Sequence, residues 1–100
     1  MNALAHWSDL RQDLDLALSL LGSVREPGRR RALLTAFRGG VRLTRGREAE
    51  ARGTLLRVLT DPGEDRSVRD YALVLLDSHR PWDEAAAEAV RRYREETTGD

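Results

Sequence analysis

Cysteine and lysine are both absent from this chain of 100 residues. Without cysteine, the chain forms no disulfide, no thiolate metal site and no cysteine nucleophile. Aromatic residues make up only 5% of the sequence, so its core must be built mainly of leucine, valine and alanine. A chain of this length buries roughly two-thirds of its unfolded surface. That is enough for one modest core, and we expect one domain over residues 1–100.

Long apolar runs are missing as well. The longest, from Leu14 to Leu21, contains Asp15 and is far too short to cross a bilayer. The opening residues MNALAHWSDL lack the basic segment followed by an apolar one that marks a secretory signal. We therefore expect a cytoplasmic location and no membrane contact.

Groups that commonly perform catalysis are also scarce. His6 and His79 have no second histidine and no acid cluster at metal-ligand spacing beside them. Gly39 and Gly40 follow no strand pattern, so they are interpreted as a helix breaker rather than a phosphate-binding loop. Acid pairs such as Glu95–Glu96 lie in charged segments, with no apolar pocket to raise a carboxyl pKa. We expect no enzyme activity, no metal and no cofactor.

What the sequence does contain is apolar residues at helical spacing along most of its length, with no alternating strand pattern. Proline, glycine and polar residues interrupt this pattern where helices begin or end. The sequence therefore predicts an all-α fold of four to five antiparallel helices. Their expected positions are about residues 4–22, 27–42, 47–60, 66–79 and 82–96.

The clearest signal is the stretch Thr54–His79, TLLRVLTDPGEDRSVRDYALVLLDSH. Pro62 and Gly63 end the first of two predicted helices, and Asp65 or Ser67 is placed to cap the second. Both helices carry one apolar face, so a short turn between them predicts an antiparallel hairpin. Its core is expected to consist of Leu55, Leu59, Val68, Ala72, Leu75 and Leu76.

This stretch resembles a HEAT repeat, a helical hairpin that stacks on its neighbours. The matching features are paired leucines, an Asp-Pro turn, a Val-Arg pair opening the second helix, then alanine and paired leucines: Leu55, Leu56, Leu59, Asp61, Pro62, Val68, Arg69, Ala72, Leu75 and Leu76. The resemblance implies a short HEAT-like solenoid, with a compact helical bundle as the alternative. It also implies an ion pair between Asp61 and Arg69 at a junction between repeats.

Charge is balanced overall but unevenly distributed. All seventeen basic residues are arginine, and they match seventeen acids. The formal charge is −2 over residues 1–24, +7 over residues 25–57 and −5 over residues 58–100. The arginines singled out as candidate contacts for a partner or for nucleic acid are Arg31, Arg38, Arg42, Arg45 and Arg52. A row of charges beside an apolar stripe is usually a solvated flank, and a buried arginine such as Arg52 must be paired.

Two functions are compatible with this pattern. The first is a small non-catalytic protein–protein interaction module, such as an adaptor, an accessory subunit or an immunity-type inhibitor, with another protein or a second copy as its partner. The alternative is a helical nucleic-acid-binding subunit that uses the arginine-rich segment 25–57. The neutral net charge and the lack of stacking aromatics favour the first.

Overall fold

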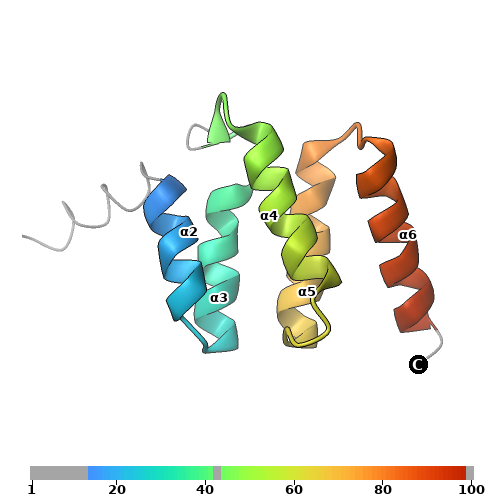
Figure 1. The fold of residues 1–100 in the computed structure, drawn as a ribbon, viewed down its shortest axis with the longest axis horizontal. Helices are drawn as coiled ribbons and strands as arrows, with labels where there is room; N and C mark the ends of the chain where they lie inside the picture. The colour runs from blue at the N-terminus through green and yellow to red at the C-terminus, as the bar shows by residue number, and fades with distance from the viewer. Residues whose placement is uncertain (1–13, 42–43, 99–100) are drawn as a thin grey trace, which may run out of the picture.

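The structure, a computed structural model, describes residues 14–41 and 44–98 of the chain. These residues form an all-α domain with no strand among them, as the sequence predicts (Figure 1). The five α-helices are α2 (Leu14–Ser23), α3 (Pro27–Leu34), α4 (Glu48–Thr60), α5 (Arg66–Leu76) and α6 (Glu84–Thr98). Two short 3₁₀ helices, η1 (Thr35–Phe37) and η3 (Asp77–His79), extend α3 and α5.

Successive helices alternate in direction from α2 to α6 (Figure 1). The most extensive contact joins α4 to α5, which form the predicted hairpin around the turn that begins at Asp61. α3 packs beside α5, and α6 packs beside α4, so the hairpin lies at the centre of the domain. α2 packs against α3 at the end opposite α6 (Figure 1).

Local signals set most helix starts. Pro27 is among the first residues of α3, and the Glu26 carboxylate accepts hydrogen bonds from the backbone N–H groups of Gly28 and Arg29. Asp65 caps α5 by accepting from the Ser67 N–H, as expected. Asp83 accepts from the Ala86 N–H at the start of α6. Side-chain oxygens thus satisfy backbone donors that the first helical turn leaves unpaired.

The helix ends differ from the predicted ones. The helix expected over residues 27–42 ends as an α-helix at Leu34 and continues only through η1. Gly39 packs against the chain of Ser78 so closely that an added Cβ would lie 2.4 Å from the Ser78 carbonyl oxygen. Gly40 has φ +80°, a left-handed conformation that ends a helix and suits glycine.

The boundaries of the other predicted helices also differ from the observed ones. The helix expected over 66–79 becomes 3₁₀ after Leu76, and the one expected over 82–96 covers Glu84–Thr98. The helix expected over 47–60 begins one residue later, at Glu48. Of the first helix, expected over 4–22, the described part runs from Leu14 to Ser23, and the rest lies outside the described residues.

The core is one cluster shared by all five helices. The six predicted hairpin residues are all buried in it: Leu55, Leu59, Val68, Ala72, Leu75 and Leu76. Leu34 from α3 and Phe37 from η1 join them, and both are fully buried. On α4 the buried face also includes Ala51, Thr54 and Val58, whereas Ala49 is exposed.

Candidate functional site

The predicted arginine surface does not form one patch. Arg38 and Arg45 are exposed near the connection between η1 and α4, whereas Arg31 is half-buried and donates to the Ser67 hydroxyl. Arg52 is also half-buried, and its guanidinium lies 3.8 Å from Asp83. Arg42 lies outside the described residues. Of the four that the structure describes, Arg31 and Arg52 are engaged within the domain, and Arg38 and Arg45 are exposed.

The structure does not bring Asp61 and Arg69 together as the predicted ion pair. The Arg69 Nε–H donates to the carbonyl oxygen of Leu59, and its guanidinium lies over the Tyr93 ring and 3.6 Å from Glu96. Asp61 instead accepts from the Gly63 N–H inside the turn. Arg69 does join neighbouring elements, but it joins the end of α4 to α6, because its long side chain reaches past the turn.

Arg30 forms an ion pair that the sequence did not indicate. Its guanidinium donates two hydrogen bonds of 2.7 Å to the Glu64 carboxylate, and both side chains are largely buried. Nη1 also donates to the carbonyl oxygens of Leu21 and Val24, at the carboxyl end of α2. This bidentate contact fastens α2, α3 and the Asp61–Asp65 turn together. It is therefore a structural feature rather than a free binding surface.

Many other arginines are likewise occupied. Arg47 is held by Asp15 and Glu50, and these hydrogen bonds raise its pKa. Arg80 pairs with Asp77 and lies over the Trp82 ring. Arginines that pair with the chain's own carboxylates are partly neutralised and attract phosphates less strongly. The formal charge of +7 over residues 25–57 is therefore larger than the positive charge that this segment presents at the surface.

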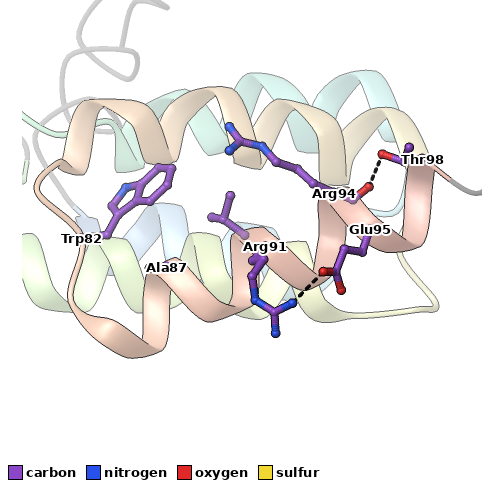
Figure 2. A pocket seen from close by; sticks show the side chains of 7 residues that line it. Trp82, Ala87, Arg91, Arg94, Glu95 and Thr98 are labelled. Atoms are coloured by element: carbon purple, nitrogen blue, oxygen red, sulfur yellow. Dashed lines mark hydrogen bonds and ion pairs between the residues drawn. The ribbon is translucent and has the colours of Figure 1, made fainter.

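A groove lies along one side of α6 (Figure 2). Its volume is about 480 Å³, its surface is mostly apolar, and it is lined by Trp82, Ala87, Val90, Arg91, Arg94, Glu95 and Thr98. Val90 is buried and forms part of the core, whereas Ala87 is exposed. We call this the α6 groove. Apart from Trp82, which precedes the helix, every residue that lines the groove belongs to α6.

Trp82 forms one end of the α6 groove. Its indole N–H donates to the carbonyl oxygen of Leu76, a distance of 2.7 Å, at the carboxyl end of α5. The indole is therefore fixed in place beside the start of α6, where Figure 2 shows it facing along the groove. An aromatic ring held this way offers apolar contact area at little entropic cost.

Arg94 differs from the other two arginines of α6. Arg91 bonds Glu88 and Glu95, and these contacts raise its pKa, while Arg92 bonds Glu88. Among the described residues no carboxylate pairs with Arg94, whose side chain lies along the α6 groove in Figure 2. The groove thus combines apolar walls with one cation that has no acidic partner within the described chain.

The interface behind the groove is closed by Tyr93. Its hydroxyl donates to the Asp70 carboxylate on α5, and burial together with this carboxylate raises the pKa of Tyr93. The contact holds α6 against the α4–α5 hairpin, together with Arg69 over the ring. Because the Tyr93 hydroxyl is already hydrogen-bonded to Asp70, this contact holds α6 in position.

Two classes of site have no structural basis in the described residues. Across residues 14–41 and 44–98 no three His, Asp or Glu side chains are grouped to hold a metal ion. His79 is buried, and its Nε2 lies 2.7 Å from the Phe37 carbonyl oxygen. None of the helices in these ranges combines the length and apolar character needed to cross a bilayer.

Comparison with known proteins returns no relatives. No protein-family model, curated protein or solved structure matches this chain.

Proposed function

We propose that this protein is a small non-catalytic module that binds another protein through the α6 groove. The observation that carries the proposal is the groove itself: a mostly apolar hollow with a fixed indole at one end and, along its side, Arg94, which pairs with no carboxylate of the described residues. Apolar surface rimmed by a few polar groups is typical of protein–protein contact sites. Adaptor, accessory subunit and inhibitor are all roles of this class.

The HEAT-like resemblance agrees with this proposal. Helices alternate in direction, α3 packs beside α5, and α4 packs beside α6. Stacked hairpins of this kind have two ends, and an end helix keeps one side that no further repeat covers. α6 is such an end helix among the described residues. We therefore propose a short HEAT-like arrangement whose end binds the partner.

The first prediction concerns cross-linking from the groove. A photoreactive amino acid at exposed Ala87 is expected to form one discrete protein adduct in cells of the source organism. The same amino acid at Ala32, exposed on α3, is the matched control and is expected to form none. Gel analysis and mass spectrometry identify the adduct. Equal labelling from both positions, or none from either, would contradict the proposed function.

The second prediction addresses the alternative, a nucleic-acid-binding subunit. This alternative is retained because Arg38 and Arg45 are both exposed, on neighbouring segments of the chain. We expect no binding of single-stranded or duplex DNA and RNA by fluorescence anisotropy at about 20 mM salt, where phosphate contacts are strongest. Binding that falls steeply with salt, and that is lost when Arg38→Glu and Arg45→Glu are combined, would favour the alternative.

A further inference from the structure

Three buried residues of α4 recur on α6 at one constant spacing. The buried residues Ala51, Leu55 and Val58 are followed 35 residues later by the buried Ala86, Val90 and Tyr93. α4 and α6 run in the same direction and pack side by side (Figure 1). The two helices therefore occupy equivalent places in successive layers of the fold.

This equivalence shows what kind of surface the α6 groove is. Leu59 continues the buried face of α4, in the core that α4 shares with α5. The residue 35 positions later is Arg94, which lines the α6 groove with Val90. Arg52, the α4 residue equivalent to Ala87, lies 3.8 Å from Asp83 beside the start of α6, so the groove corresponds to the side of α4 that faces α6. In the described part of the chain no helix packs on α6 in this way.

We propose that the α6 groove binds an amphipathic helix of another protein, which places a carboxylate against Arg94. This inference rests on the proposed function and names the class of partner. Between Ala87 and Thr98 the groove follows about three helical turns, roughly 17 Å at 1.5 Å per residue. A bound helix of about the same length covers it.

The charge of the partner follows from Arg94. A helix that covers the groove removes water from its apolar walls and from the adjoining guanidinium. A buried cation needs a paired acid, and none of the ion pairs in the described chain includes Arg94: Glu88 and Glu95 pair with Arg91 and Arg92, and Glu96 lies beside Arg69. The arriving helix must therefore supply the acid. Trp82, fixed at the end of the groove, offers an apolar contact for its first or last turn.

The chain itself provides a probe of this chemistry. A synthetic peptide of residues 65–79, blocked at both ends, contains α5, an amphipathic helix with Asp65, Asp70 and Asp77. Titration of the whole 100-residue protein with this peptide is followed by amide NMR. We expect shifts concentrated at Ala87, Val90 and Thr98. Replacing the three aspartates with asparagine is expected to weaken binding about tenfold, equivalent to about 1.4 kcal/mol.

Two protein variants locate the contact. Arg94→Glu is expected to weaken the peptide about tenfold, whereas Arg92→Glu, on an exposed residue of the same helix outside the groove, changes affinity less than about twofold. Circular dichroism checks that both variants remain helical. Absence of binding, equal effects of the two variants, or shifts centred on α4 would overturn the inference.

Two further outcomes separate this inference from the proposed function. Sedimentation that shows a dimer dissociated by Arg94→Glu would identify a second copy as the occupant and overturn the assignment to another protein. A discrete adduct from Ala87 combined with failure of the acidic peptide would leave the binding function in place and overturn only the acidic helix. If neither the Ala87 adduct nor binding of the acidic peptide is observed, the proposed function is overturned as well.

Discussion

Replacing Arg30 with alanine is expected to lower the free energy of unfolding by about 3 kcal/mol. The substitution leaves the Glu64 carboxylate, whose side chain is only 8% exposed, without its bidentate partner. It also removes the donor that serves the Leu21 and Val24 carbonyl groups at the end of α2. Urea denaturation monitored by circular dichroism measures the change.

Two matched variants test that explanation of Arg30. Arg29→Ala removes an exposed neighbouring arginine of α3 and is expected to change the unfolding free energy by less than about 0.5 kcal/mol. Replacing Arg30 and Glu64 together with leucine leaves no unpaired charge, so part of the loss is expected to be recovered. A loss for Arg30→Ala below about 1 kcal/mol would show that this pair does not hold α2 and the turn together.

Replacing Phe37 with alanine is expected to lower the free energy of unfolding by about 3–5 kcal/mol. Phe37 is completely buried, and it is the only phenylalanine of the chain. It lies in the core cluster where η1 contacts both α2 and α4. Truncation leaves a cavity between α2, at one end of the domain, and α4, at its centre. Chemical denaturation again provides the measurement.

Phe37→Leu and Val74→Ala provide the comparison for the Phe37 prediction. Leucine refills most of the space, so its cost is expected to be below about 1.5 kcal/mol. Val74 is 64% exposed on α5, and its truncation is expected to change stability by less than about 0.5 kcal/mol. Equal losses for Phe37→Ala and Val74→Ala would mean that Phe37 is not part of a packed core.

The sequence by itself determined the fold class and its central hairpin. Leu55 and Leu59 are four residues apart, which places them on one face of the first helix, and Leu75 lies on the apolar face of the second. Pro62 and Gly63 determine where the first helix ends. These are local effects, because spacing decides which side chains share a helix face and proline removes a backbone donor. The same reasoning narrowed the cap of the second helix to Asp65 or Ser67, and the structure has Asp65, whose carboxylate accepts from the Ser67 N–H.

The contacts of the charged residues were decided by the tertiary structure alone. Arg30 and Glu64 lie 34 positions apart, and Arg69 bonds the Leu59 carbonyl oxygen and approaches Glu96 rather than Asp61. Every arginine has the same long, flexible side chain, and seventeen acids were available as partners. The packing of the helices against one another determines which guanidinium reaches which carboxylate.

The α6 groove was likewise beyond the sequence. Its residues Ala87, Val90 and Arg94 belong to a helix that the sequence predicts correctly, and the apolar spacing is visible in it. A helix face becomes a binding groove only where the fold leaves it uncovered. That depends on α4 packing beside α6, and on Trp82 being fixed by the Leu76 carbonyl oxygen. Spacing within one segment carries no information about which faces remain uncovered, so the three-dimensional packing decided it.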